Sequence, residues 1–167
     1  MIPKPIFISQ LGEGKLFAMP HPPGGVYLHG ALTHLAETGI TSIVSLLDEF
    51  DISVLGLAEE EYICQLRSID FLHLPIKDRS APIRSDEYLE AVNKIYDHIV
   101  VGGNAVVHCW AGCGRTGLFN ASLLVRHGTA PEAAFQQVSE ARGLPVPDTQ
   151  VPVSYTHLRA HETDSYL

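Results

Sequence analysis

The sequence predicts an α/β three-layer sandwich, in which a mostly parallel central sheet is flanked by helices. Short apolar and β-branched runs alternate with amphipathic stretches of helical period, which is typical of parallel strands joined by helical crossovers. The 167 residues, 46% of them hydrophobic, are enough for one domain with a buried core. In a sheet of this kind, the ligand site lies beyond the carboxyl ends of the strands.

The first half of the chain opens with two apolar runs around a glycine turn, which indicates two adjacent strands. Gly39 follows a helical pattern and suits the position just after a helix end. Glutamates gather at the start of a later pattern, where the helix dipole favours negative charge. These signals predict strands over residues 5–9 and 15–19, a helix over 31–37, a strand over 41–47, a helix over 57–68 and a strand over 71–76.

The second half begins with a long amphipathic stripe that ends at the glycines 102–103. Ser85 or Asp86 suits the N-cap of this helix. Thr129 and Glu132 form a capping-box pattern that predicts the start of the last helix. The other signals predict a strand over residues 105–107, a helix over 115–127 and an end of the last helix at 142.

The segment 104–117, N-A-V-V-H-C-W-A-G-C-G-R-T-G, carries the chemistry. A strand, a tight glycine loop and a helix N-terminus form an anion site, because loop N–H groups point inward and the helix end adds about half a positive charge. This field favours the thiolate of Cys109 at the start of the loop. Arg115 can hold two oxygens of a tetrahedral anion in a bidentate fork. A thiolate beneath a bound phosphate indicates a phosphate-ester hydrolase.

This segment resembles the signature of the cysteine-dependent protein tyrosine phosphatases, in particular the compact dual-specificity branch with its bacterial members. The matching residues are His108, Cys109, Gly112, Gly114, Arg115, Thr116 and Gly117. The resemblance extends over residues 5–150 and implies the fold of that family. If Cys109 were only a small buried hydrophobe, the glycines and Arg115 would have no explanation.

The signature residues have distinct expected roles. Cys109 attacks phosphorus, and Thr116 hydrogen-bonds the thiolate when it departs in the second step. His108 is expected to order the loop through hydrogen bonds rather than to transfer protons. Backbone amides of the loop are expected to hold the phosphoryl oxygens. We call residues 109–115 the cradle; besides Cys109 it comprises Trp110, Ala111, Gly112, Cys113, Gly114 and Arg115.

The leaving oxygen needs a proton, so a general acid is expected opposite the cradle. The family places an Asp just beyond the strand that precedes the long helix, and Asp78 occupies that position. Asp86 is a second candidate, although its position favours helix capping. Asp48 and Asp51 follow another strand and remain open as alternatives. In the family a downstream Gln positions the attacking water, and Gln150 is the nearest match.

Two residues of the cradle have two interpretations each. Cys113 is either a small loop filler or the partner of Cys109 in a regulatory disulfide formed under oxidation. Trp110 either shapes the rim of the cradle or packs beneath it. Cys64 lies in a helical pattern and is expected in the core.

Bulk properties narrow the function further. A formal charge of −8 argues against nucleic-acid or anionic-membrane binding. The three cysteines form no disulfide framework, and a thiolate nucleophile needs reducing conditions, so we expect a cytoplasmic, monomeric protein. No apolar run approaches the roughly 18 residues of a membrane span, and the N-terminus lacks a secretory pattern. No cofactor or metal is expected, and His157 and His161 form no metal site.

The sequence thus predicts a phosphomonoester hydrolase, either a tyrosine or a dual-specificity phosphatase, with a phosphocysteine intermediate. The alternatives are the same chemistry on a small phosphorylated metabolite or phospholipid, or a phosphopeptide-binding module without turnover. The phosphoinositide phosphatases that this segment resembles carry lysines in the loop; the cradle has none, and the resemblance therefore disfavours a multiply phosphorylated lipid. Residues 1–151 form the expected catalytic domain. Residues 152–167 form an expected non-native tail, because 153–163 resemble a translated transposase sequencing adapter.

Overall fold

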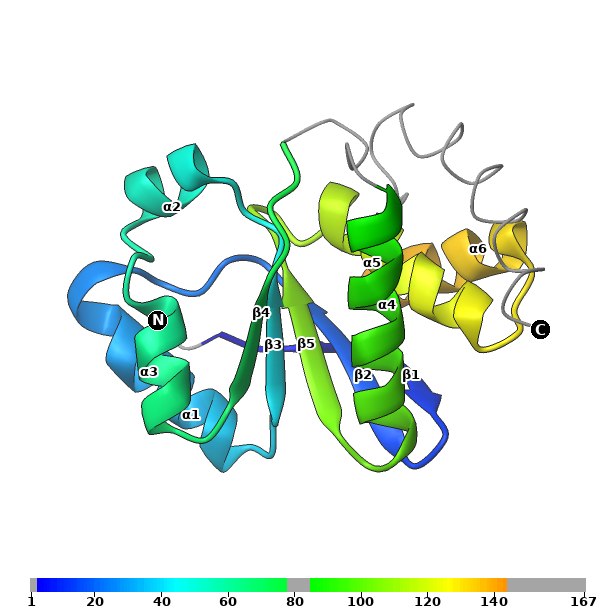
Figure 1. The fold of residues 1–167 in the computed structure, drawn as a ribbon, viewed down its shortest axis with the longest axis horizontal. Helices are drawn as coiled ribbons and strands as arrows, with labels where there is room; N and C mark the ends of the chain where they lie inside the picture. Colours follow the sequence, from blue (N-terminus) through cyan, green and yellow to red (C-terminus); the bar gives the residue numbers. More distant parts are fainter. Residues whose placement is uncertain (1–2, 78–84, 144–167) are drawn as a thin grey trace.

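The computed structural model describes residues 3–77 and 85–143 (Figure 1). Its strands are β1 (Ile6–Leu11), β2 (Gly14–Met19), β3 (Ser42–Ser45), β4 (Asp70–His73) and β5 (Asn104–His108). A short 3-10 helix, η1 (Gly25–Tyr27), precedes α1 (Leu28–Glu37), α2 (Glu49–Leu55) and α3 (Glu60–Leu66). The later helices are α4 (Ser85–Val100), α5 (Gly114–Arg126) and α6 (Pro131–Arg142).

The five strands form one sheet in the order β1-β2-β5-β3-β4. All neighbours pair in parallel except β1 and β2, which form an antiparallel hairpin. The tight turn of this hairpin requires Gly12, whose φ of 62° is in the left-handed region. The other strands are joined by segments that contain helices, which a parallel pairing needs. The predicted mostly parallel sheet is therefore confirmed.

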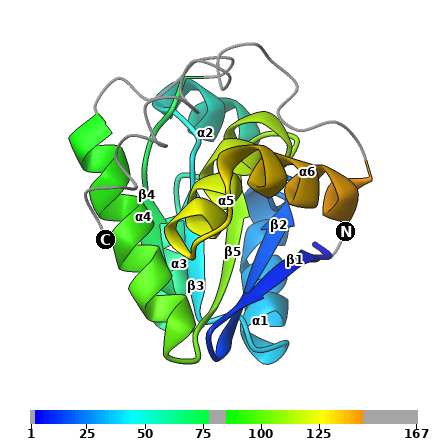
Figure 2. The ribbon, with the colours of Figure 1, turned by 90° about the vertical axis from the view of Figure 1, so that its right-hand side faces the viewer.

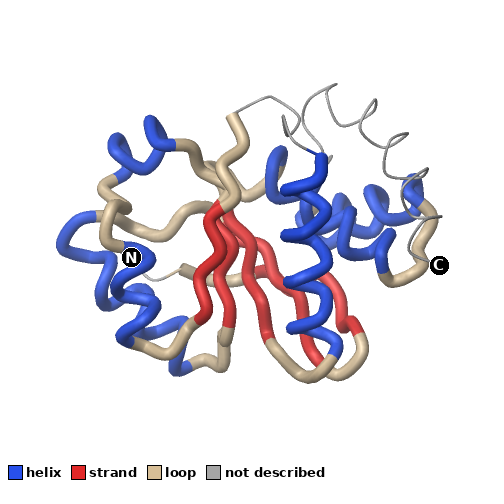
Figure 3. The backbone as a smooth tube through the Cα atoms, in the orientation of Figure 1, coloured by secondary structure: helices blue, strands red, loops and turns tan. Residues whose placement is uncertain are grey.

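Helices cover both faces of the sheet, so the predicted three-layer sandwich is confirmed as well. Helices α1 and α3 lie on one face, and α4, α5 and α6 lie on the other (Figures 1 and 2). The tube view shows the strands as a continuous layer between these two groups of helices (Figure 3). Strand β5 lies at the centre of the sheet, and the side chains of Ala105–Val107 are completely buried.

Several element bounds shift: the strands predicted over 71–76 and 41–47 span only Asp70–His73 and Ser42–Ser45, and the helix predicted over 31–37 begins at Leu28. Two other local predictions differ in kind. The sequence did not predict α2, a helix of only 7 residues that begins with a capping box between Asp48 and Asp51. The predicted capping box at Thr129 is wrong, since Ala130 is the N-cap of α6 and makes no side-chain capping bond. Pro131 follows at the first helical position; its fixed φ suits a helix start, and it has no N–H that needs a cap.

Several predictions concern residues outside the described ranges. Asp78, Gln150 and the expected tail, residues 152–167, all fall there, so they remain predictions. None of the helices in the described part of the chain has both the length and the apolar character needed to cross a bilayer.

Candidate active site

Strand β5 carries the predicted nucleophile, Cys109, to the carboxyl edge of the sheet. It lies between β2 and β3, both parallel to it, so its last residue, His108, meets the ends of two neighbouring strands. Cys109 follows at once and is 3% exposed. The chain then turns through the cradle and enters α5 at Gly114. The predicted order of strand, loop and helix N-terminus is therefore the order in the structure.

The cradle is packed tightly against the segment that follows β2. The N–H of His21 donates to the carbonyl oxygen of Trp110 at 3.1 Å. Gly112 has a φ of 78°, and a Cβ added there would lie 2.5 Å from the carbonyl oxygen of Met19. This position therefore requires glycine for two reasons, its backbone conformation and the nearby chain. Backbone contacts therefore fix the shape of the loop.

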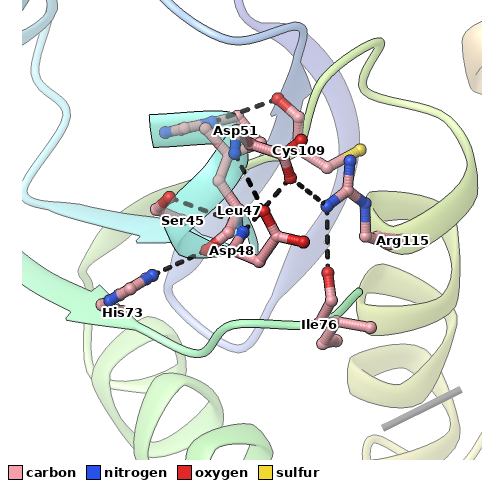
Figure 4. Close-up of polar contacts among 9 residues, drawn as sticks. Ser45, Leu47, Asp48, Asp51, His73, Ile76, Cys109 and Arg115 are labelled. Atoms are coloured by element: carbon pink, nitrogen blue, oxygen red, sulfur yellow. Dashed lines mark hydrogen bonds and ion pairs between the residues drawn. The ribbon is translucent and has the colours of Figure 1, made fainter. Parts of the chain in front are cut away.

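Arg115 is buried in the first turn of α5, and its guanidinium points toward the side chain of Cys109 (Figure 4). Its Nη1 donates to Oδ2 of Asp51 at 2.8 Å and to the carbonyl oxygen of Ile76 at 2.9 Å. These two bonds come from different parts of the chain and fix the plane of the guanidinium. The structure thus brings together the predicted nucleophile and the predicted phosphate-binding arginine.

Asp51 is the partner of Arg115 in a buried ion pair. Burial alone would raise the pKa of Asp51, but the hydrogen bond and charge of Arg115, together with hydrogen bonds from Asp48, hold it below its ordinary value. At neutral pH Asp51 is therefore a carboxylate and has no proton to donate. An ionised Asp51 is suited to orienting Arg115 rather than to the general-acid role that the sequence left open for it.

The structure also places Asp48 and Asp86, the other two candidates for the general acid. Asp48 is the N-cap of α2, and its Oδ1 accepts from the N–H of Asp51 at 2.9 Å. The loop before it is fixed by the His73 ring, whose Nε2 donates to the Leu47 carbonyl oxygen at 2.7 Å (Figure 4). Asp86 lies exposed in the first turn of α4. Asp48 thus acts as a helix cap.

His108 is buried beneath the cradle and contacts an acid that the sequence did not single out. Its Nε2 lies 2.7 Å from Oε2 of Glu60, and its Nδ1 lies 3.3 Å from the carbonyl oxygen of Cys109. The second contact agrees with the expected ordering of the loop. Glu60 begins α3, where the sequence explains an acid by the helix dipole alone, so no sequence signal pointed to this pairing.

Helix α6 supplies a cation next to the cradle. Nη2 of Arg142 donates to the Ala111 carbonyl oxygen at 3.4 Å and lies 3.3 Å from Sγ of Cys113. Trp110 is 38% exposed, and its ring meets His21 edge-on with centroids 6.1 Å apart, which places it at the rim rather than beneath the loop. The absence of lysine in the cradle is therefore offset by an arginine from outside the motif.

Two other predicted residues are buried. Thr116 lies in the first turn of α5, and its hydroxyl has no hydrogen-bond partner within residues 3–77 and 85–143. Cys64 is in the core, as predicted; burial, and then the charges of Glu60 and Glu61, raise its pKa to about 12. Within the same ranges, no group of three or more His, Cys, Asp or Glu side chains is arranged to hold a metal ion.

Comparisons with known proteins agree with this geometry. Residues 19–129 match the model of a family described as the DSP-PTPase phosphatase of polymorphic toxin systems. A phosphatidylglycerophosphate phosphatase PTPMT1 of Arabidopsis thaliana is 26% identical over 148 residues, which are 86% of this chain and 42% of that protein. The chain thus spans less than half the length of this relative.

Solved structures share the fold. Kinase associated phosphatase superimposes with a TM-score of 0.86 at 18% identity, covering 100% of this chain and 99% of that chain. Tk-PTP in its active form has a TM-score of 0.73 at 23% identity, covering 100% of both chains. A PTPMT1 structure has a TM-score of 0.74 at 15% identity, covering 98% of both. With the family model matching well over half of its residues, the chain belongs to the DSP-PTPase phosphatases, a family of cysteine-dependent tyrosine and dual-specificity phosphatases.

Proposed function

We propose that this chain hydrolyses phosphomonoesters through a phosphocysteine formed on Cys109. The observation that carries the proposal is the Arg115 guanidinium, which Asp51 and Ile76 hold pointing toward the side chain of Cys109 (Figure 4). A buried sulfur at a helix N-terminus, faced by a fixed guanidinium, suits a nucleophile that attacks a bound phosphate.

The first step transfers the phosphoryl group to sulfur. The Cys109 thiolate attacks phosphorus in line, the S–P bond forms, and the ester P–O bond breaks. Asp78, the predicted acid, gives its proton to the leaving oxygen. Arg115 and the cradle amides bind the equatorial oxygens, and they need no reorientation because the surrounding chain already holds them.

The second step releases inorganic phosphate. The Asp78 carboxylate takes a proton from water, the water oxygen attacks phosphorus, and the P–S bond breaks to return the thiolate. The buried hydroxyl of Thr116 is suited to donate a hydrogen bond to the departing sulfur. Gln150 is the predicted residue that positions this water.

The proposed substrates are phosphorylated proteins, with phosphotyrosine first because the exposed Trp110 borders the site. One observation favours a second candidate, a phospholipid or small phosphorylated molecule. The Arabidopsis relative is named a phosphatidylglycerophosphate phosphatase, and a PTPMT1 structure is a complex with PI(5)P. Arg142 beside the cradle supplies a cation for a second anionic group of such a substrate. We further propose a cytoplasmic, monomeric protein without membrane or nucleic-acid partners.

A substrate panel tests the proposal on the full-length, reduced protein. An aryl phosphate, a phosphotyrosine peptide, a phosphoserine peptide, phosphatidylglycerophosphate and inositol phosphates are compared by released phosphate. We expect turnover with the aryl phosphate and the phosphotyrosine peptide, complete loss in Cys109→Ser, and a phosphoenzyme trapped on Cys109 after rapid quenching. Binding of phosphopeptides without turnover in the wild-type protein would instead establish the binding-module alternative.

The role of Asp78 has its own test. Asp78→Asn should slow substrates with poor leaving groups far more than those with good ones, because only the former depend on protonation of the leaving oxygen. Asp86→Asn is the matched control and should leave both rates unchanged. An equal loss on both substrate classes in Asp78→Asn would remove Asp78 from the role of acid.

A further inference from the structure

A buried acid–base pair lies beneath the cradle, formed by Glu60 of α3 and His108 of β5. The two residues are 2% and 0% exposed, and their Oε2 and Nε2 atoms are 2.7 Å apart. We propose that Glu60 is a positioning residue that keeps His108 doubly protonated and thereby favours the thiolate of Cys109. This inference rests on the proposed function, since it concerns how the nucleophile is kept ionised.

The positions of the two ring nitrogens support the doubly protonated form. Nδ1 of His108 lies 3.3 Å from the carbonyl oxygen of Cys109, and a carbonyl oxygen only accepts, so Nδ1 carries a proton. Nε2 faces the carboxylate of Glu60, which also accepts. A ring with an acceptor at each nitrogen makes both hydrogen bonds only as an imidazolium. A buried cation of this kind requires a paired anion, which Glu60 provides.

The sheet neighbours of His108 and the nearby Cys64 carry no charge that competes with the pair. In the sheet His108 lies beside Met19 of β2 and Ser45 of β3, which carry no ionisable group. One turn after Glu60 on α3 comes Cys64, whose pKa is raised to about 12 by burial and by the charges of Glu60 and Glu61. Cys64 is therefore a neutral thiol at neutral pH and does not compete for the proton of His108.

The His108 ring is close enough to Cys109 for its charge to affect the ionisation of the thiol. The imidazolium is hydrogen-bonded to the carbonyl group of Cys109 itself, so its positive charge lies next to the residue that must lose a proton. It adds to the N-terminus of α5, which also favours negative charge at this point. Among the hydrogen bonds within residues 3–77 and 85–143, the Glu60 carboxyl group bonds to His108 and to no residue of the cradle, so Glu60 acts through His108.

The variant Glu60→Gln separates charge from shape, because glutamine has nearly the size of glutamate and can still accept from Nε2 but carries no negative charge. Two quantities are measured against pH in the full-length protein: kcat/KM for an aryl phosphate, and the rate of alkylation of Cys109 by iodoacetamide, mapped by mass spectrometry. We expect the acid limb of both profiles to move up by about one pH unit, which corresponds to about a tenfold lower rate below the limb. The alkaline plateau should remain.

Glu61→Gln is the matched control, since it removes the same charge from the adjacent, exposed residue of α3 and should leave both profiles in place. In a His108→Asn background, Glu60→Gln should add no further shift, because its effect passes through the imidazole. A measurement on the wild-type protein needs no variant: nitrogen NMR of the imidazole should show both ring nitrogens of His108 protonated at neutral pH.

The outcomes are distinct from those of the proposed function. Wild-type protein without turnover would refute the hydrolase, while the alkylation profiles and the NMR signal would still test the role of Glu60. An active enzyme whose Glu60→Gln variant keeps the wild-type acid limb, or a His108 ring with a single proton at neutral pH, would overturn the inference.

Discussion

Two acid–base pairs border the cradle at opposite ends, and they differ in what they can control. The outer pair joins Asp51 of α2 to Arg115 at the end of the cradle, with 2.8 Å between Oδ2 and Nη1. The inner pair joins Glu60 of α3 to His108 just before it, with 2.7 Å between Oε2 and Nε2. Both acids come from short helices that lie between β3 and β4.

The difference lies in the base. A guanidinium is cationic at every physiological pH, so the outer pair cannot change its charge at Arg115 and serves to fix an orientation. An imidazole, unlike a guanidinium, can be neutral or cationic, so in our proposal the inner pair sets how much positive charge lies beside Cys109. Two similar ion pairs around one loop can therefore have different roles. The outer pair fixes the orientation of Arg115, and in our proposal the inner pair controls the ionisation of Cys109.

Arg115→Lys breaks the outer pair and has the largest expected effect. A lysine ammonium cannot bond Asp51 and the Ile76 carbonyl oxygen and also fork onto phosphate, so kcat/KM should fall about 10²–10³-fold. Steady-state kinetics with an aryl phosphate measures this. The control is Arg126→Lys at the far end of α5, where the guanidinium lies over the Tyr96 ring. Comparable losses in both variants would mean that the effect is structural.

Asp51→Asn removes the acid of the same pair, and its expected effect is on the free energy of unfolding. Removing one partner leaves the buried charge of Arg115 uncompensated, which should lower the free energy of unfolding by about 3 kcal/mol at neutral pH. The folded-state pKa of Asp51 lies below its ordinary value of 3.8. The stabilisation is therefore complete above that value and is lost as pH falls through the lowered pKa.

Urea unfolding of wild type and Asp51→Asn over a pH series measures this difference. Glu49→Gln, an exposed change in the first turn of the same helix, should stay within about 0.5 kcal/mol of wild type. A difference between wild type and Asp51→Asn that persists unchanged well below pH 3.8 would contradict the assignment of the ion pair.

Gly112→Ala sharpens the comparison by disturbing the loop between the two pairs. The added Cβ meets the Met19 carbonyl oxygen in a left-handed backbone, so stability should fall by about 1–3 kcal/mol, together with kcat/KM. Gly128→Ala is the control, since its φ of 114° is also left-handed but no atom lies within 4 Å of the added Cβ. Thermal unfolding should show a larger loss for Gly112→Ala, and equal losses would refute the close approach to β2.

The smallest expected effect is on the alkylation of Cys64, which is sensitive to the charge of Glu60 in the inner pair. With its pKa raised to about 12, first by burial and then by Glu60 and Glu61, the thiol should resist iodoacetamide at neutral pH in the folded protein. In Glu60→Gln, alkylation of Cys64 should begin at a slightly lower pH, because burial, the largest cause, remains. Mass spectrometry of tryptic peptides measures both, and rapid labelling of Cys64 at neutral pH would contradict the expectation.

The fold and the nucleophilic motif were predictable from the sequence because their signals are local. Alternating strand and helix patterns predicted the layers and the mostly parallel sheet, and the segment 104–117 predicted the strand, cradle and helix in their observed order. The helix α2 was missed because its 7 residues are too few for a clear helical period. The cap of α6 was misassigned because the capping-box pattern at Thr129 competed with a proline helix start.

The partners of the motif could not be predicted in the same way. Asp51 lies 64 positions before Arg115, and Glu60 lies 48 positions before His108. In the sequence, Glu60 is one of several acids at a helix start, and Asp51 is one of three acids after a strand. The order of residues in these two segments does not predict which acid becomes buried next to Arg115 or His108.

By itself, the sequence determined the order of strand, loop and helix around the predicted nucleophile, because adjacent residues on one strand, one turn and one helix specify that geometry. The tertiary structure alone decided which carboxylates neutralise Arg115 and His108. The physical reason is that a charge can be buried only beside its counter-charge. Which counter-charge is available depends on how α2 and α3 pack at the carboxyl edge of the sheet.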